Sequence, residues 1–488
     1  MSSHDTFRRS FNEEYSGNLS LSRVIGQTSQ SNATIAALPS GYVIYAAGCV
    51  AILYDPHTNK QVSFLNVSRA ISSLCASNDG CFVAIGERGH QPSITVWDSS
   101  TYKQIACLDG HQHGIGSLKF SPDGRYLVSV GFQHDKQLTL WDWQENQIIC
   151  THKIENKVHS LSFHPSGNFF VTCGDRHLKW WYLVKVNDSA DSKPKVVGIN
   201  GRPASILDKQ KDAVFVDITC APPLADPSLQ SNVYTTTSTG MLCLVHESRL
   251  MDKWVQLDSA HSYSLSLTSS LLLVGSSNGK VFVLSPASLE MLSTLPLPFP
   301  LSASTDMHTH TASTPTPSYP ACYGVCAVPS SALVLCSYAD RSMIFWDIGD
   351  VLSPAKLRSF VFHRACIWDI QFIETSGSAG EADSDKAEGP LGQGTFATCG
   401  ADNSIIFWNI DPKQQRKSKW RSRLSRDILH VLDLGRGGGA SATAHINRRS
   451  RSTPPPTDLS TAVPDVELPD RQQVRRDGLS VLCCDLCV

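Results

Sequence analysis

The chain has 488 residues, which is enough for one large hydrophobic core or two cores of medium size. Its apolar content of 41% is ordinary for a globular protein, and its net charge of -2 excludes an overall field that would attract nucleic acid or an anionic membrane. No apolar run of about eighteen residues occurs and the N-terminus is polar, so we expect neither a membrane-spanning helix nor a signal peptide. The sixteen cysteines are scattered among predicted strands, which indicates reduced thiols and a cytoplasmic protein.

The N-terminal part of the chain changes character near Leu21. Residues 1–20 are polar and lack hydrophobic periodicity, so we predict that they are disordered. From Ala33 to Val67 the chain offers three short apolar runs, the last of which ends at Tyr54, and then a fourth run of strand character. This stretch predicts a first, degenerate unit of four strands.

The clearest unit of the chain lies between Asp109 and Trp143. Its three apolar runs are separated by the turn sequence SPDG at residues 121–124 and by a second polar turn at residues 133–136. Gly-His opens the unit at residues 110–111 and Trp-Asp closes it at residues 141–142, a framing typical of the WD repeat, which is a four-stranded blade of a β-propeller. One blade cannot bury both of its faces, so the unit predicts neighbouring blades.

The same unit recurs along the chain. The Trp141 position of the closing strand has these counterparts: Tyr54, Trp97, Trp181, Val245, Leu284, Trp346 and Trp408. The first intervals are 43, 44 and 40 residues, the period of this repeat class, and the later intervals are 64, 39, 62 and 62. We attribute the long intervals to surface insertions at residues 184–211, 294–320 and 374–394. The prediction is an all-β WD-repeat β-propeller over residues 21–410, with seven or eight blades.

An acidic or amide side chain also recurs six residues before the closing position. These residues are Asp135, Asp175, Asn278, Asp340 and Asp402. With nearby His, Ser or Thr, and Trp they form two sets, His111, Ser129, Asp135 and Trp141, and His152, Thr172, Asp175 and Trp181. A Ser-His-Asp set could be catalytic, but a set that repeats from blade to blade favours a structural hydrogen-bonded tetrad. We therefore predict no catalytic residue and no enzyme.

The sequence offers little support for a metal or a cofactor. The pair His308 and His310, the pair Cys322 and Cys326, and the cysteines of residues 483–487 all lack the partners that a four-ligand zinc site needs. No phosphate-binding glycine motif is present either. We predict that the protein uses no cofactor.

The chain loses the blade pattern after residue 410. Residues 411–434 combine a basic run with one apolar stretch that resembles a closing strand without its blade, and the run could be a solvated linker or a kinase-docking peptide, with the linker favoured. Residues 435–488 are rich in Gly, Arg, Ser and Pro, so we predict a disordered C-terminal tail. Kinase-site patterns fall at four positions, Thr314, Thr316, Ser452 and Thr453.

Several phrases outside the general repeat pattern resemble one family. They are residues 47–50 (AGCV), 59–61 (NKQ), 129–135 (SVGFQHD), 174–182 (GDRHLKWWY), 250–255 (LMDKWV) and 292–296 (LSTLP). The chain resembles the WD-repeat scaffold family of mitogen-activated protein kinase-binding protein 1 and its microcephaly-associated, spindle-pole paralogue. The resemblance implies a pair of propellers with a long tail, found in the cytoplasm and at centrosomes and spindle poles, which assembles c-Jun N-terminal kinase components. Measured against that pattern, we expect this sequence to contain only a fragment of the second propeller and a tail of different sequence.

The expected function is that of a non-catalytic scaffold or adaptor that binds proteins, without nucleic acid or membrane partners. The loops before the inner strands of a propeller gather on one face, and rigid scaffolds with variable loops suit recognition. The candidate partner-binding residues on these loops are Arg69, His113, Lys157, His159 and Arg364. Two alternatives are a substrate receptor of a ubiquitin ligase and, less favoured, a propeller enzyme with ionisable side chains converging in its channel.

Overall fold

The computed structural model of the chain describes residues 21–186, 195–205, 212–221, 232–297, 319–329, 331–373, 395–409 and 428–433. These residues form eight four-stranded antiparallel sheets and one short 3-10 helix, η1 (Asn32–Thr34). The described residues include no helix that is long and apolar enough to cross a bilayer. The all-β propeller prediction is thereby confirmed.

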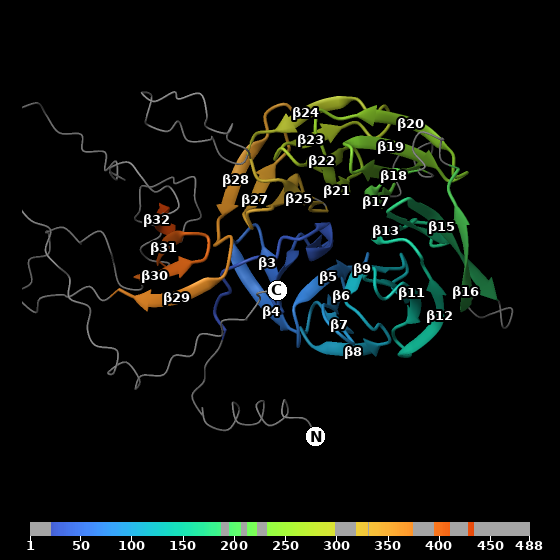
Figure 1. The fold of residues 1–488 in the computed structure, drawn as a ribbon, viewed down its shortest axis with the longest axis horizontal. Helices are drawn as coiled ribbons and strands as arrows, with labels where there is room; N and C mark the ends of the chain where they lie inside the picture. Colours follow the sequence, from blue (N-terminus) through green and yellow to red (C-terminus); the bar gives the residue numbers. More distant parts are fainter. Residues whose placement is uncertain are drawn as a thin grey trace, which may run out of the picture.

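Seven of the sheets stand around a ring (Figure 1). In each, the strands follow in chain order from the centre outward. The first blade is β1 (Ile35–Ala37), β2 (Val43–Ala47), β3 (Val50–Asp55) and β4 (Lys60–Asn66), and the second is β5 (Ile71–Ala76), β6 (Phe82–Glu87), β7 (Ser93–Asp98) and β8 (Gln104–Asp109). The third is β9 (Ile115–Phe120), β10 (Tyr126–Gly131), β11 (Gln137–Asp142) and β12 (Gln147–Lys153), the fourth is β13 (Val158–Phe163), β14 (Phe169–Gly174), β15 (His177–Val186) and β16 (Lys195–Pro203), and the fifth is β17 (Phe215–Cys220), β18 (Asn232–Thr237), β19 (Met241–His246) and β20 (Met251–Gln256). The sixth is β21 (Ser262–Leu267), β22 (Leu272–Ser276), β23 (Val281–Leu284) and β24 (Met291–Leu295), and the seventh is β25 (Cys322–Ala327), β26 (Leu333–Tyr338), β27 (Met343–Asp347) and β28 (Ala355–Phe360).

The ring closes between its first and last blades. Inner strands of neighbouring blades pack side by side from β5 on β9 to β21 on β25, and β1 packs between β25 and β5. The segment before β1 completes the closure: Gln27 Nε2 donates to Ser337 Oγ of β26 over 2.6 Å, and Ser29 Oγ lies 2.9 Å from the same oxygen. Of the two blade counts that the sequence allowed, seven is therefore the one that closes.

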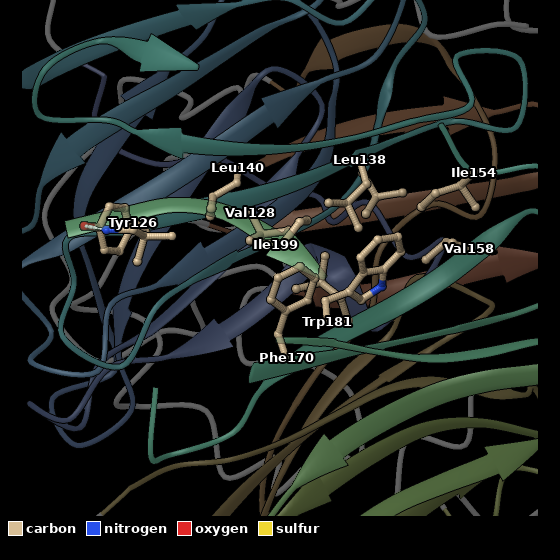
Figure 2. Close-up of a cluster of buried hydrophobic side chains, with 12 residues drawn as sticks. Tyr126, Val128, Leu138, Leu140, Ile154, Val158, Phe170, Trp181 and Ile199 are labelled. Carbon is tan, nitrogen blue, oxygen red and sulfur yellow. Dashed lines mark hydrogen bonds between the residues drawn. The ribbon is translucent and has the colours of Figure 1, made fainter. Parts of the chain in front are cut away.

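Blades are held together by apolar faces that pack sheet on sheet. The cluster between the third and fourth blades joins Val128 and Leu140 of β10 and β11 to Phe170 and Trp181 of β14 and β15 (Figure 2). These side chains alternate along their strands because successive residues of a strand point to opposite faces. Each closing-strand Trp of the ring thus faces a neighbouring blade. Full burial of one large apolar side chain stabilises the fold by about 3 kcal/mol.

The eighth sheet lies outside the ring. It comprises β29 (Ile367–Phe372), β30 (Thr395–Gly400), β31 (Ser404–Asn409) and β32 (Ile428–Asp433). In Figure 1 it stands to the left of the ring, in orange and red, and among the described residues β29 has no packing on a ring strand like that between ring inner strands. Its small core, with Trp408, meets Ile25 and Phe362.

Two predicted boundaries are wrong. The apolar stretch in residues 411–434 is no isolated strand, because β32 pairs with β31 from Ile428↔Trp408 to Asp433↔Ser404 and completes the eighth sheet. The predicted insertion 184–211 is partly blade: β15 runs to Val186 and pairs with β16, which begins at Lys195. The strand β16 was missed because its sequence is largely polar and lacks a regular apolar pattern, whereas β32 was recognised as a strand but not as the partner of β31, from which residues 410–427 separate it. Residues 1–20, 374–394, 410–427 and 434–488, and with them the predicted disordered ends, lie outside the described residues.

Candidate functional site

The predicted tetrad of the third blade is present in full. His111, which precedes β9, places Nε2 2.7 Å from Ser129 Oγ on β10 and hydrogen-bonds through Nδ1 to the Asp135 carboxylate. Trp141 of β11 donates its indole N–H to the same Ser129 Oγ over 2.7 Å. Ser129 is 0% exposed, so no substrate can reach its hydroxyl. The set ties β10 and β11 to two loops, and its burial, rather than its Ser-His-Asp distances, excludes nucleophilic attack on a substrate.

The surroundings of Asp135 keep it ionised. Burial raises the pKa of this carboxyl group, but hydrogen bonds from His111 and from the Gln112 backbone N–H outweigh burial and leave the pKa below its ordinary value. Gly131 makes the site possible, because a Cβ there would collide with the Asp135 side chain. The tetrad is therefore a buried, fully bonded charge network whose role is to stabilise the blade.

The predicted tetrad of the fourth blade is wrong in two members. Trp181 Nε1 donates to Thr172 Oγ1 over 2.9 Å as expected, but His177 Nε2, at 2.8 Å, occupies the histidine position. His152 lies on β12, the outer strand of the third blade, where its ring packs 5.5 Å from that of Trp181. Asp175 lies outside the network and pairs with His159 over 2.8 Å.

A tighter hairpin explains this exchange. Gly174 of β14 pairs directly with His177 of β15, so only two residues make the turn, and Asp175 points toward the loop face rather than inward. Burial, and after it the charge of Lys179, lowers the pKa of His177 to about 4. His177 is therefore neutral at pH 7 and accepts or donates one hydrogen bond without a buried charge.

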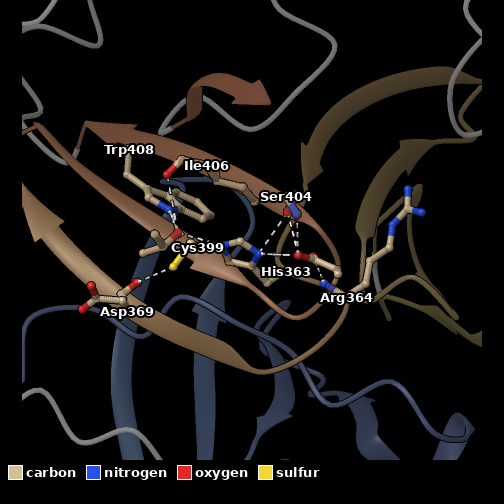
Figure 3. A network of polar contacts seen from close by, with 9 residues as sticks. His363, Arg364, Asp369, Cys399, Ser404, Ile406 and Trp408 are labelled. Atoms are coloured by element: carbon tan, nitrogen blue, oxygen red, sulfur yellow. Dashed lines mark hydrogen bonds and ion pairs between the residues drawn. The ribbon is translucent and has the colours of Figure 1, made fainter. Parts of the chain in front are cut away.

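The eighth sheet carries a complete tetrad that the sequence analysis missed. His363 Nε2 lies 2.7 Å from Thr398 Oγ1, His363 Nδ1 lies 3.1 Å from Asp402 Oδ1, and Trp408 Nε1 donates to Thr398 Oγ1 over 2.7 Å (Figure 3). The sequence Thr-Cys-Gly at residues 398–400, which repeats residues 172–174, was the available signal. Residues 374–394 separate His363 from its partners along the chain and hid the set.

The loops before β5, β9 and β13 form a continuous surface on one end of the ring. We define the loop face as residues 68–70, 88–91, 110–114, 132–136, 156–157 and 175–176. Neighbouring blades are joined here by backbone: Gln91 N–H donates to Gln112 O over 2.9 Å, and Gly114 N–H donates to Gly89 O over 2.8 Å. Lys157 O accepts the Asp175 N–H over 2.9 Å. The face is therefore a surface held by a rigid scaffold.

Four of the five candidate partner-binding residues gather on or beside this loop face. Arg69 is held by the buried Glu87, which accepts its backbone N–H over 3.3 Å, and its guanidinium donates to His90 O. The exposed His113 ring lies 5.8 Å from the His90 ring and 6.4 Å from the His134 ring. Lys157 is exposed, and His159 is partly exposed beside Asp175.

Arg364 does not belong to this group. It precedes β29 of the eighth sheet, where its backbone N–H donates to Asp402 Oδ2 over 2.8 Å while its side chain points away from the tetrad (Figure 3). Its prediction as a ring-face residue failed because the eighth repeat was counted as a ring blade. The candidate phosphorylation sites Thr314, Thr316, Ser452 and Thr453 lie outside the described residues.

Among the described residues of the inner strands, Asp217 is a buried carboxylate, and it has structural partners. Asp217 of β17 accepts hydrogen bonds from Asn32 Nδ2 at 2.9 Å, from Leu265 N at 2.7 Å and from Ile218 N at 2.9 Å. Burial raises its pKa despite these bonds. Asn32 belongs to η1, which packs on the inner strands β5, β9, β21 and β25 and so fills the channel centre. Within the described residues no group of three or more His, Cys, Asp or Glu side chains is placed to hold a metal ion.

Comparison with known proteins adds sequence relatives to this geometry. The family model "WD domain, G-beta repeat" matches residues 102–142 and 143–182, which overlap the third and fourth blades. Mitogen-activated protein kinase-binding protein 1 of Mus musculus is 33% identical over 86% of this chain and 28% of its own length. WD repeat-containing protein 62 of Sus scrofa is 31% identical over 84% of this chain and 26% of its own length.

A third relative gives the same picture. Mitogen-activated protein kinase-binding protein 1 of Homo sapiens is 32% identical over 86% of this chain and 28% of its own length. The chain thus spans less than a third of the length of these curated relatives. The resemblance inferred from the sequence is confirmed: the chain is a WD-repeat protein related to mitogen-activated protein kinase-binding protein 1 and to WD repeat-containing protein 62.

Proposed function

We propose that the chain is a non-catalytic scaffold that binds protein partners through the loop face of its ring. The observation that carries the proposal is that Arg69, His113 and Lys157 are exposed on three successive blades while buried contacts hold their backbones. Preorganised side chains lose little entropy on binding, which favours recognition. The tetrads are buried and η1 lies in the channel, so neither competes with the exposed loops, which are the surface that rigid scaffolds commonly use for recognition.

The charge of the loop face indicates the kind of partner. Its exposed cations are Arg69, Arg88, Lys136, Lys157 and Arg176. The side chain of Asp175, the carboxylate that reaches this surface, is engaged by His159. Complementary charge speeds association and selects partners, so an acidic protein segment is the favoured ligand.

We further propose that the partners include a mitogen-activated protein kinase, with c-Jun N-terminal kinase the first candidate, and that the protein acts in the cytoplasm, at centrosomes and spindle poles. One relative, mitogen-activated protein kinase-binding protein 1, is named for binding such a kinase. The support for this step is therefore relatedness, whereas the support for the loop face is geometry.

One experiment tests both steps separately. Purified full chain and the triple variant Arg69→Ala, His113→Ala, Lys157→Ala are titrated with c-Jun N-terminal kinase by biolayer interferometry. We expect at least about a tenfold loss of affinity in the variant. The matched control, Lys103→Ala with Lys253→Ala, removes exposed charges away from the loop face and should bind as the parent does. Equal binding by the triple variant overturns the loop face.

Proximity labelling in dividing cells tests the scaffold class itself. Labelling of kinase and centrosomal proteins that the triple variant loses supports the proposal. Labelling dominated by ubiquitin-ligase adaptors would instead favour the substrate-receptor alternative. Absence of kinase binding by the parent chain in the titration overturns the kinase step alone.

A further inference from the structure

The inner strands of neighbouring ring blades contact one another by a repeated rule. Seven inner strands, β5, β9, β13, β17, β21, β25 and β29, each have six residues and shift register with their second strand after the first residue. We number these residues 1 to 6. Because these strands have the same length and carry the bulge at the same position, residues with the same number face a neighbouring blade in the same way.

The rule has a polar part. At position 3, Asp217 Oδ2 accepts the N–H of Leu265, which is position 4 of the next inner strand, over 2.7 Å. At position 5, Ser162 Oγ accepts the N–H of Cys220, position 6 of the next strand, over 3.2 Å. Ser266 and Ala327 repeat this second contact at 2.9 Å. A side-chain oxygen at an odd position thus binds the backbone N–H one position further along the neighbour.

The rule also has an aromatic part. Tyr263 and Tyr323 occupy position 2 of the neighbouring strands β21 and β25, and their rings meet edge to face at 5.0 Å. Such pairs contribute about 1 kcal/mol beyond the area that they bury. Position 2 is the bulged residue, so its side chain projects toward the adjoining blade.

Strand β29 carries each of these features, but among the described residues no inner strand packs beside it as in the ring. Trp368 stands at position 2 and is 71% exposed, and Phe372 at position 6 is 60% exposed. Asp369 stands at position 3 and Gln371 at position 5, both exposed. Asp369 Oδ1 accepts the Ile370 N–H over 2.8 Å, as Asp217 Oδ1 accepts the Ile218 N–H over 2.9 Å, so the carboxylate already has the orientation used in the ring.

We propose that β29 of one copy of this chain binds β29 of a second copy, side by side, as neighbouring inner strands do in the ring. The second copy is the occupant that fits because β29 holds both halves of the contact. Gln371 supplies the position 5 acceptor, Phe372 supplies the position 6 N–H, and Trp368 supplies an aromatic ring at position 2 on both sides. Two large apolar side chains exposed on one strand, Trp368 and Phe372, favour association.

The geometry sets the kind of assembly. Blade-on-blade packing joins unlike flanks of the two strands, so the contact is head-to-tail and leaves one free β29 flank at the end of each oligomer. Association should therefore grow with concentration rather than stop at a fixed dimer. The ring is not part of the contact, so its stability should not change.

Sedimentation velocity of the purified full chain between about 1 and 100 µM tests the proposal, a range set by the affinities of small interfaces. The weight-average mass should rise with concentration, and Trp368→Lys and Gln371→Ala should raise the concentration needed by at least about tenfold. Trp254→Lys is the matched control, because Trp254 is 54% exposed on the ring strand β20. A parent chain that stays monomeric at 100 µM, or association unchanged in Trp368→Lys, overturns the proposal.

A crosslink identifies the occupant directly. A photoreactive phenylalanine placed at position 368 in a mixture of isotopically light and heavy chains should join residues 367–372 of one copy to residues 367–372 of another. Crosslinks to a different part of the chain overturn the second copy as the occupant of this strand. Amide exchange of β30 and β31, compared between parent and Trp368→Lys, separates lost association from lost folding: equal protection shows that the variant sheet is folded.

Discussion

The third ring blade and the eighth sheet are built alike and placed differently. Both have four strands in chain order, and both hold an Asp-His-Ser/Thr-Trp tetrad with similar distances. In the ring, β10 is buried along its whole length, whereas β30 is buried only at Thr395 and Thr398. The inner strand β9 is mostly buried and β29 is not. The tetrad is therefore a device within one blade, and burial comes from neighbours.

This comparison predicts the largest effect for a closing-strand Trp of the ring. Trp141→Ala removes a 2% exposed indole from the core and the donor to Ser129, so we expect a loss of about 3–5 kcal/mol in the free energy of unfolding, measured with urea. The matched variant Trp408→Ala in the eighth sheet should leave the ring transition unchanged and reduce only amide protection in residues 395–409. An equal loss in both variants would mean that ring and eighth sheet unfold as one unit.

The next effect tests the histidine of the tetrad. His111→Ala leaves the buried Asp135 and Ser129 without their partner, and we expect a loss of about 2–4 kcal/mol by chemical denaturation. His152→Ala is the control, since His152 only packs against Trp181 and should cost less than about 1 kcal/mol. A larger loss of unfolding free energy in His152→Ala than in His111→Ala would mean that His152 is the tetrad histidine of the fourth blade after all.

The third prediction concerns pH. The pKa of His177 is lowered from 6.5 to about 4 in the fold, so between these values the unfolded chain binds more protons and stability falls as pH falls. We expect a loss of about 2 kcal/mol between pH 7 and pH 4.5, measured by urea unfolding. His177→Gln should flatten this slope.

Asp135 and Asp402 cannot mimic that result. Their pKa values lie below 3.8 in the fold, so the stability that they contribute is present above that value and is lost only at lower pH. Burial also lowers the pKa of His152, which adds a slope of the same sign, so only a slope that is unchanged in His177→Gln would contradict the assignment to His177.

The smallest effect concerns the segment in the channel. Asn32→Ala removes one hydrogen bond to the buried Asp217 and one to Leu265 O, and we expect a loss of about 1–2 kcal/mol in ring stability. Asn66→Ala, at the exposed end of β4, is the control and should change stability by less than about 0.5 kcal/mol. Differential scanning calorimetry of both variants decides, and no change in Asn32→Ala would show that η1 does not help to close the ring.

Local chemistry explains why the strands could be predicted. All eight closing positions fall on third strands, from Tyr54 on β3 to Trp408 on β31, and the SPDG turn forms as expected, with Gly124 at φ 72° and its N–H bonded to Ser121 O over 2.9 Å. Alternation of apolar residues and turn-forming residues act within a few positions, so they are legible in the sequence. The outer strand β16 was not, because its exposed positions remove the pattern, and the pairing of β32 with β31 was not, because residues 410–427 separate the two strands.

The candidate site was predicted in the same uneven way. The first tetrad followed from residue types at a regular spacing, whereas the second depended on the length of one hairpin, which decides whether Asp175 points inward or toward His159. Arg364 was assigned to the eighth repeat correctly but to the ring wrongly, because repeats look alike whether or not they close into a ring. The spacing of residue types along the chain indicates which hydrogen bonds a side chain can form. The lengths of the hairpins and the closure of the ring decide which partners lie close enough to form them.

The sequence by itself determined the blade, its strands, its turns and its relatedness, because these depend on neighbours along the chain. Only the tertiary structure decided that seven blades close, that the segment of Gln27 and Asn32 helps to seal the ring, and that β29, within the part of the chain that the structure describes, does not pack beside an inner strand of the ring. The physical reason is that ring closure depends on the summed angle between packed faces and on contacts such as Gln27 with Ser337, which are distant in sequence and leave no periodic pattern.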